Sequence, residues 1–374
     1  IMPDIHSNLP PSSSERWIKC PPSALLNVGG NTGSSYTQQG TDAHSLCEYK
    51  IKKALGYKVR DPTEDLTFFD EEMAEHTDAY CEFIMDQIAD AKQNCSDPLV
   101  LVEQRLNFSR WVNESFGTAD CVIVADGTMS VVDFKYGLGI LIDSENNSQM
   151  RMYALGALDI FECLYDIQKI RMIIFQPRRD NISISEITKD ELLAWADEVL
   201  VPAANLAAKG EGEFKAGKHC QFCKVKAQCR TRAEYNLQLA KYDFAVPDTL
   251  TQNEISMILD RADTFIRWVN DVKEYALEQA VSGTSYPGFK VVEGRSNRRY
   301  TNDEAVAAVL TDAGYDPFEK KLMGITAMTK LLGKKRFHHM LGSLIEKPHG
   351  KPTLVPESDK RPAWNTAGDD FKEE

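Results

Sequence analysis

Residues 117–136, GTADCVIVADGTMSVVDFKY, contain two β-branched runs on either side of Asp126-Gly127. An Asp-Gly pair between two such runs predicts a hairpin with a two-residue turn. In that register the numbers of opposed residues sum to 253, so Asp120 faces Asp133. Lys135 is two residues beyond Asp133 and shares its face. The hairpin therefore places two carboxylates and a lysine together.

Both faces of this hairpin are otherwise apolar, which is typical of a central strand pair covered on both sides. Like charges opposite each other destabilise a sheet, and burying them unpaired is costly. A divalent cation between Asp120 and Asp133, with Lys135 near a bound water or a substrate oxygen, explains the pattern. The alternative is a local Asp133–Lys135 ion pair, with Asp120 in a solvated strand end, and the spacing alone leaves both open.

Two more residues extend this acidic cluster. Glu103 follows the apolar residues 99–102 of the preceding predicted strand and adds a third carboxylate. His44 lies on a predicted helix over residues 41–55 and adds a fourth ligand. A lone helical histidine is more often a core residue, so His44 by itself does not establish a metal site.

The surrounding sequence alternates between helical and strand periods. Thr41 is the expected N-cap of the first helix, and a capping box at Thr188-Lys-Asp-Glu191 opens a helix that ends near Gly210. The pattern predicts helices over 41–55, 71–92 and 144–165, and strands over 99–106, 119–125, 130–136, 169–176 and 182–187. The order of helix, three strands, helix and two strands indicates an α/β fold.

The chain has 374 residues, with 43 Lys and Arg against 56 Asp and Glu, a formal net charge of −13. This ordinary globular composition excludes wholesale disorder, collagen-like repeats and a small disulfide scaffold. With no apolar run of membrane-span length and no signal peptide pattern, we expect a soluble, cytoplasmic protein without a membrane partner. We expect a domain over 1–240 that includes an irregular arm (1–40), a mostly helical region over 245–345, and a flexible tail over 346–374.

The cysteines suggest a second site, because disulfides are rare in a reducing compartment. Cys220, Cys223 and Cys229 lie within ten residues of a Gly- and Lys-rich loop. A four-thiolate site needs one more ligand, and Cys20 is the best candidate, since the other five cysteines lie in helix or strand patterns. Zinc and an iron–sulfur cluster both suit such a set. Residues 214–233 also carry six Lys and Arg and no acid, which suits phosphate contacts.

Several motifs together resemble the RecB-type nucleases of the PD-(D/E)XK superfamily. They are Gly117-Thr-Ala-Asp120, Asp133-Phe-Lys135 and Gln149-Met-Arg-Met-Tyr153, with His44 matching the motif of the N-terminal helix. The resemblance spans about Cys20 to Arg232 and implies a central mixed sheet flanked by helices. One departure is Tyr136, where relatives usually carry Thr or Ser, and we expect it to alter substrate contacts more than metal binding.

The resemblance implies metal-dependent phosphodiester hydrolysis. His44, Glu103, Asp120 and Asp133 would hold Mg²⁺ or Mn²⁺, which activates water and polarises phosphate. Lys135 would orient that water or stabilise charge on the phosphoryl oxygens. Gln149 and Tyr153 would face the site, although core packing explains Tyr153 equally well.

The one-plus-three cysteine pattern is similar to the iron–sulfur branch of this group, which includes CRISPR adaptation nucleases and the AddB nuclease domain. This implies a 4Fe-4S cluster on Cys20, Cys220, Cys223 and Cys229, with zinc as the competing metal. The layout also resembles a phage and prophage family of RecB-like nucleases. We therefore expect a DNA exonuclease acting on single strands or duplex ends in phage replication or recombination, in a bacterial host cell. A phage recombination protein is a candidate partner. The alternatives are a non-catalytic DNA-binding scaffold and an RNA-directed nuclease, and the oligomeric state stays open.

Overall fold

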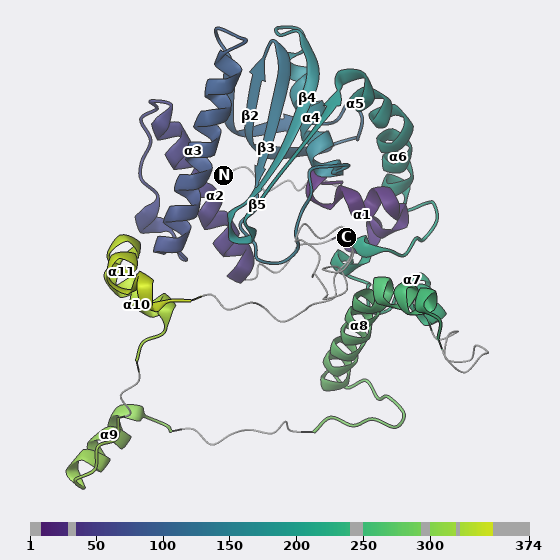
Figure 1. Ribbon diagram of the computed structural model, residues 1–374. Helices are drawn as coiled ribbons and strands as arrows, with labels where there is room; N and C mark the ends of the chain where they lie inside the picture. The colour runs from purple at the N-terminus through teal and green to yellow at the C-terminus, as the bar shows by residue number, and fades with distance from the viewer. Residues whose placement is uncertain (1–8, 29–34, 240–249, 293–299, 319–321, 347–374) are drawn as a thin grey trace, which may run out of the picture. The chain divides into compact units, whose positions relative to one another are not determined.

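The computed structural model describes residues 9–28, 35–239, 250–292, 300–318 and 322–346 (Figure 1). The chain divides into two compact units, Ile1–Ala276 and Leu277–Glu374. Among the described helices, none is both long and apolar enough to cross a bilayer. The boundary expected near residue 245 falls outside the described residues, as does the tail expected over 346–374 from residue 347 onward.

The first unit is built on a five-stranded mixed sheet in the order β1-β2-β3-β4-β5. Only β3 and β4 are parallel, because α4 crosses between them, and the other neighbours are antiparallel. The strands are β1 (Leu99–Asn107), β2 (Phe116–Ala125), β3 (Gly127–Phe134), β4 (Ile167–Gln176) and β5 (Asn181–Thr188). The expected mixed sheet flanked by helices is confirmed.

The predicted hairpin register is also confirmed. Cys121 pairs with Val132 and Val122 with Val131, so paired numbers sum to 253. The turn is tied to the start of β4 by two hydrogen bonds, from the Gly127 amide to the Asp166 carbonyl at 2.7 Å and from the Asp166 amide to Asp126 Oδ1 at 3.1 Å. A two-residue turn thus fixes which side chains share a face.

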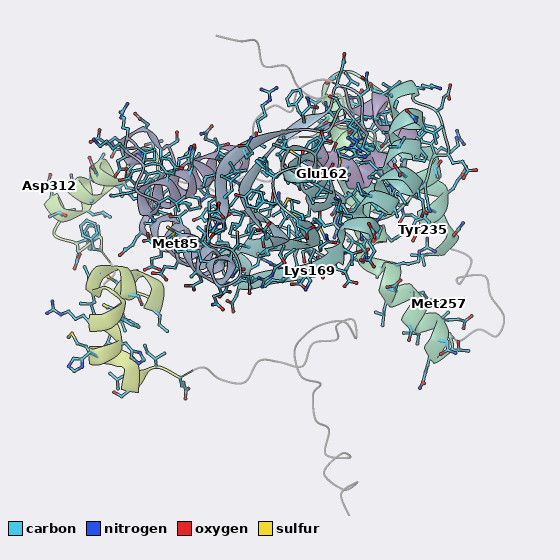
Figure 2. All side chains as sticks on the ribbon, turned by 90° about the horizontal axis from the view of Figure 1, so that it is seen from above. Met85, Glu162, Lys169, Tyr235, Met257 and Asp312 are labelled. Carbon is cyan, nitrogen blue, oxygen red and sulfur yellow. The ribbon has the colours of Figure 1, made fainter. Side chains whose placement is uncertain are left out.

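Helices cover both faces of the sheet, so consecutive residues of the central strands β2 and β3 are buried. One face packs on α2 (Ser35–Ala54) and α3 (Glu71–Lys92). The other packs on α4 (Ser148–Phe161), on α5 (Lys189–Trp195) and on a π-helical turn (Ala196–Leu200) that continues into α6 (Val201–Lys209). Figure 2 draws the described side chains as sticks, including those of the strands and of these helices.

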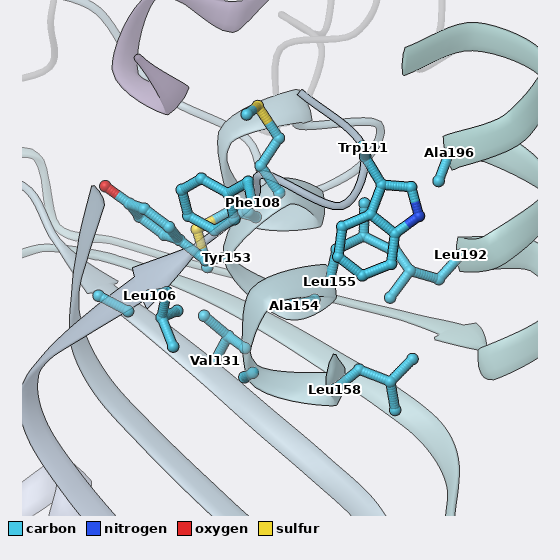
Figure 3. Close-up of a cluster of buried hydrophobic side chains, with 14 of the residues drawn as sticks. Leu106, Phe108, Trp111, Val131, Tyr153, Ala154, Leu155, Leu158, Leu192 and Ala196 are labelled. Carbon is cyan, nitrogen blue, oxygen red and sulfur yellow. The ribbon is translucent and has the colours of Figure 1, made fainter. Parts of the chain in front are cut away.

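The core on the α4 face contains large side chains that meet small ones. Figure 3 shows Phe108 and Leu106 against α4, with Trp111 toward Leu192 and Ala196 of the helix that follows β5. Gly156 lets this contact form, because a Cβ there would lie 2.6 Å from Phe108 Cε1. Close approach of α4 to β1 therefore depends on that glycine.

The helix ends follow local capping chemistry. The Asp70 carboxylate accepts a hydrogen bond from the Met73 amide and caps α3. The predicted capping box of Thr188 and Glu191 is present, and the helix it opens ends at Gly210 in a left-handed conformation. The expected start of the first helix at Thr41 is wrong, because α2 already begins at Ser35. Thr41 therefore lies inside the helix instead of capping it.

The N-terminal arm is more ordered than expected over residues 9–28. It forms α1 (Ser14–Lys19) and short 3₁₀ turns, and Trp17 is fully buried with its indole N–H donated to the Pro10 carbonyl at 3.2 Å. Ser14 Oγ lies 2.6 Å from Ser148 Oγ at the start of α4. The arm is thereby fastened to the sheet domain.

The remaining helices follow the cysteine loop. A 3₁₀ turn η7 (Lys218–Phe222) and α7 (Arg230–Leu237) flank the last two cysteines, and α8 (Gln252–Val281) begins in the first unit. The second unit contains α9 (Asp303–Asp312), α10 (Ile325–Leu332) and α11 (Lys334–Leu341). The described residues between 250 and 346 are mostly helical.

Candidate functional site

The acidic residues meet where the strand ladder opens. Pairing of β1 with β2 skips Glu103 and Asp120, with Val102 and Gln104 paired on either side of Glu103. Glu103 has a φ of 53°, a left-handed conformation that is uncommon for a non-glycine residue and marks an irregularity in the strand. The Asp120 Oδ2 accepts a hydrogen bond of 2.6 Å from the Phe134 amide. Asp120 is only 9% exposed, so it does not lie in a solvated strand end.

His44 joins these carboxylates from α2. Its Nδ1 lies 3.3 Å from Asp120 Oδ1 and 3.8 Å from Glu103 Oε1, and one ligand atom from each of the three residues falls within 4.8 Å of the others. Burial alone would lower the pKa of His44, but Asp120 and then Glu103 raise it to about 10. The imidazole edge also packs on Phe134, with ring centroids 5.5 Å apart. His44 is therefore held among negative charges rather than in an apolar core.

Asp133 and Lys135 form an adjacent ion pair on the same face of the sheet. The Lys135 Nζ lies 2.8 Å from Asp133 Oδ2, and Asp133 is 2% exposed. Burial and then Asp120 raise the pKa of Asp133, against the lowering effect of Lys135. Burial would lower the pKa of Lys135, but Asp133 and Asp120 raise it. The lysine is therefore positively charged at neutral pH.

Gln149 and Tyr153 of α4 complete this network. Gln149 Nε2 donates to Asp133 Oδ1 at 3.3 Å and to the Tyr153 hydroxyl at 3.1 Å, while its Oε1 accepts from Lys135 Nζ at 3.3 Å. Tyr153 is 6% exposed and its ring lies 6.2 Å from that of Phe108. Tyr153 therefore combines the two roles that the sequence left open, because its ring packs in the core while its hydroxyl faces Gln149.

The donor set fits a hard divalent cation. His44, Glu103 and Asp120 supply one imidazole nitrogen and carboxylate oxygens, a combination that suits Mn²⁺ or Mg²⁺. Asp133 lies outside this group of three and is paired with Lys135 instead. All six residues expected at the catalytic centre, with His44, are nevertheless brought to one end of the hairpin.

The four expected cysteine ligands also converge. Cys20, Cys220, Cys223 and Cys229 line one pocket, although 200 positions separate the first two. All four are free thiols, and the first three are buried. Two N–H groups point at sulfur: Asn27 Nδ2 lies 3.4 Å from Cys223 Sγ, and the Gly217 amide lies 3.4 Å from Cys220 Sγ.

Cationic side chains share this pocket with the cysteines. They include Arg16, Lys215, Lys226 and Arg232. Burial raises the pKa of the Cys220 thiol, while the Gly217 amide and Arg232 lower it. Donors and cations around sulfur stabilise thiolates, so the residues present fit a thiolate-bound metal centre.

Sequence reasoning missed the residues that surround the cysteines. Arg16 lies four residues before Cys20, one helical turn away, and that spacing was the available signal. Arg232 belongs to the basic segment 214–233 that is expected to contact phosphate, but it is 3% exposed and bonded to Asp271 at 2.6 Å. No sequence signal links Asp271 to Arg232, which lies 39 positions earlier.

Comparison with known proteins gives a family. The model described as "Protein of unknown function (DUF2800)" matches residues 6–362. A solved structure titled "Crystal structure of SSO0001" is 15% identical and matches over 98% of its own chain and 52% of this one, with a TM-score of 0.24. A TM-score of that size supports no conclusion about fold or function. Because the family match covers most of the sequence, this chain belongs to the family described as Protein of unknown function (DUF2800).

Proposed function

We propose that this protein is a metal-dependent deoxyribonuclease of the RecB-type PD-(D/E)XK class, acting as an exonuclease on single strands or DNA ends. The observation that carries the proposal is the meeting of His44, Glu103 and Asp120 beside the Asp133–Lys135 pair. A purely structural ion pair would need only Asp133 and Lys135. The charge of the buried Asp120 is balanced by protonated His44 when no metal is bound, and a divalent cation would replace that proton.

In this proposal His44, Glu103 and Asp120 hold Mg²⁺ or Mn²⁺. The bound cation supplies Lewis-acid polarisation of the scissile phosphate and a water nucleophile at neutral pH. Lys135 keeps its proton because of Asp133, and its Nζ stabilises negative charge that develops on the phosphoryl oxygens. Gln149 positions both Lys135 and Asp133, and Tyr153 fixes the Gln149 amide.

We further propose that Cys20, Cys220, Cys223 and Cys229 hold a 4Fe-4S cluster with a structural role, as in the iron–sulfur branch of these nucleases. The buried thiols, the N–H groups aimed at sulfur and the cationic lining support a thiolate-bound metal. Zinc is the competing assignment. Metal and sulfide analysis of anaerobically purified protein separates the two.

DNA is the proposed substrate and a phage recombination protein the proposed partner, in the cytoplasm of a bacterial host. The charges at the site suit a phosphodiester, since Lys135 and a cation would both face it. The competing function is a DNA-binding scaffold without catalysis. The intact Asp120, Asp133 and Lys135 favour the nuclease, because a scaffold has no need of opposed buried carboxylates.

The test is incubation of anaerobically purified full chain with end-labelled single- and double-stranded DNA. We expect cleavage with Mn²⁺ or Mg²⁺, and none with Ca²⁺ or EDTA. Asp133→Asn and Lys135→Met should each lower the rate about 10²–10³-fold, as loss of one charge-stabilising group does. Lys169→Met is the matched control, because this lysine lies on the neighbouring strand but is 52% exposed and pairs with Glu186.

Folding and DNA binding of each variant are measured alongside cleavage, so that a lost activity can be separated from a lost fold. DNA binding in Ca²⁺ should be similar for all three variants, and each should be folded at the assay temperature, although Lys135→Met is expected to melt earlier because it leaves buried Asp133 without its partner. Wild-type rates in Asp133→Asn would remove the catalytic assignment. DNA binding without cleavage in any metal would favour the scaffold, and cleavage of RNA alone would change the substrate.

A further inference from the structure

Helix α8 contacts the cysteine loop at residues that lie between the cysteines. Arg267 Nη1 donates to Gln221 Oε1 at 2.8 Å, and Gln221 lies between Cys220 and Cys223. One turn later, Asp271 Oδ1 lies 2.7 Å from Nζ of Lys226, which lies between Cys223 and Cys229. These contacts are within the first compact unit. Helix α8 thus contacts the loop both between Cys220 and Cys223 and between Cys223 and Cys229.

Asp271 is the centre of this contact. It is 7% exposed, and its second oxygen accepts a 2.6 Å hydrogen bond from Arg232, which is 3% exposed. The same Arg232 nitrogen donates to the Lys226 carbonyl at 3.1 Å. Burial would raise the pKa of Asp271, but Lys226 and Arg232 lower it, so the carboxylate is ionised. A buried carboxylate with two cationic partners is costly to leave unpaired.

The backbone of the cysteine loop fixes where both cations lie. The Lys226 amide donates to the Cys223 carbonyl at 3.1 Å, and the Cys229 amide donates to the Val225 carbonyl at 2.9 Å. Cys229 is also the N-cap of α7, and Arg232 lies in the first turn of that helix. The positions of Lys226 and Arg232 are therefore coupled to the backbone conformation of the segment that carries Cys223 and Cys229.

We propose that α8 is a latch that closes on the metal-bound form of the cysteine site, through Asp271 bonded to Lys226 and Arg232. Metal binding holds the loop in the shape that presents both cations, and docking of α8 holds the same shape. The two events therefore stabilise each other, and the coupling is reciprocal. The inference rests on the proposed thiolate-bound metal but not on nuclease activity.

The latch also gives the cysteine site an effect beyond its own loop. The described helix continues from Asp271 to Val281, beyond the limit of the first unit at Ala276. Loss of the metal would free the segment of α8 that precedes the second unit. The state of the cysteine site would thus be transmitted along α8.

The first test uses hydrogen exchange on the anaerobic full chain, before and after metal removal by a chelator under reducing conditions. We expect amides of residues 261–276 to exchange on the order of tenfold faster without metal, within the usual range of coupling between sites. Peptides of α3, which packs on the far face of the sheet, should not change. Equal exchange of α8 in both states would overturn the latch.

The second test measures reciprocity. Asp271→Asn should lose its metal to the chelator on the order of tenfold faster than wild type, whereas Asp263→Asn, an exposed carboxylate on the same helix, should match wild type. Equal loss from the two variants would overturn the role of Asp271, and if Asp271→Asn fails to fold, the exchange test decides. If the anaerobically purified protein carries no metal at the four cysteines, the proposed latch is overturned. DNA cleavage is measured separately, so the latch and the nuclease proposal can each fail without the other.

Discussion

Replacement of Asp120 by Asn should lower the pKa of His44. In the native site the imidazole lies 3.3 Å from one Asp120 oxygen and 3.8 Å from Glu103, and its pKa is about 10 instead of 6.5. Asn keeps the size of the side chain and an oxygen for the Phe134 amide, but it removes the charge. An opposite charge at this range shifts a pKa by ~1–3 units. We expect a fall of that size, with Glu103 accounting for the shift that remains.

The raised pKa also sets how stability depends on pH. A shift from 6.5 to about 10 corresponds to ~5 kcal/mol at 1.36 kcal/mol per unit, but the His44 side chain is 32% exposed, so about 2 kcal/mol is the realistic value. Because the folded-state pKa is raised, this stabilisation is complete below pH 6.5 and is lost as pH rises toward 10. Mn²⁺ needs the neutral imidazole, so its affinity should rise over the same interval.

The assay is NMR titration of protein labelled at histidine Cε1, prepared anaerobically without added divalent cation. The chain has seven histidines, and His44→Gln identifies the resonance. In wild type this resonance should titrate far above pH 7, and in Asp120→Asn it should move toward neutral pH. The electrostatic account of the site would be refuted by a His44 pKa near 6.5 in wild type, or by a His44 pKa that is the same in wild type and Asp120→Asn.

Three further predictions test other parts of the molecule. Cleavage should be at least as fast in Mn²⁺ as in Mg²⁺ because imidazole is a softer ligand than Mg²⁺ prefers, and His44→Ala should abolish that preference in a rate comparison; an unchanged preference would return His44 to a packing role. Cys20→Ser should lower bound iron and the melting temperature together, since its metal bonds would close a 200-position loop, whereas exposed Cys163→Ser should keep both; full metal content in Cys20→Ser would contradict the ligand set. Gly156→Ala should lower the free energy of unfolding by about 1–3 kcal/mol, measured by thermal unfolding, because its Cβ would lie 2.6 Å from Phe108. Gly40→Ala is the control: it has open space around it in α2 and should be neutral or stabilising by up to ~1 kcal/mol. Equal effects at the two glycines would contradict the packing argument.

Local chemistry made much of the fold predictable. The Asp126-Gly127 turn fixes the hairpin register, and alternation then places Asp120, Asp133 and Lys135 on one face without any knowledge of the rest. The capping box at Thr188 and the left-handed Gly210 similarly fix the two ends of a helical segment. The start of α2 was not fixed in this way, because Ser35 and Thr37 are N-cap residue types as well as Thr41, so local chemistry does not choose among them.

The candidate site was predictable in its members but not in its arrangement. Sequence patterns put Glu103 on a strand, yet only the structure shows the left-handed backbone at which the β1–β2 ladder opens and lets His44 reach Asp120. Spacing also suggested Asp133 as a metal ligand, whereas in the fold Gln149 and Lys135 occupy its oxygens. Competition between partners depends on distances that spacing does not contain.

The sequence by itself determined the hairpin, the order of helices and strands, and the set of cysteines, because turns, caps and periodicity act over a few residues. Tertiary structure alone decided which distant groups meet. Cys20 reaches the cysteine loop because Trp17 and Ser14 anchor the arm, and Asp271 reaches Arg232 because α8 packs on that loop. Such contacts arise from burial and charge pairing across long stretches of chain, which local sequence patterns do not encode.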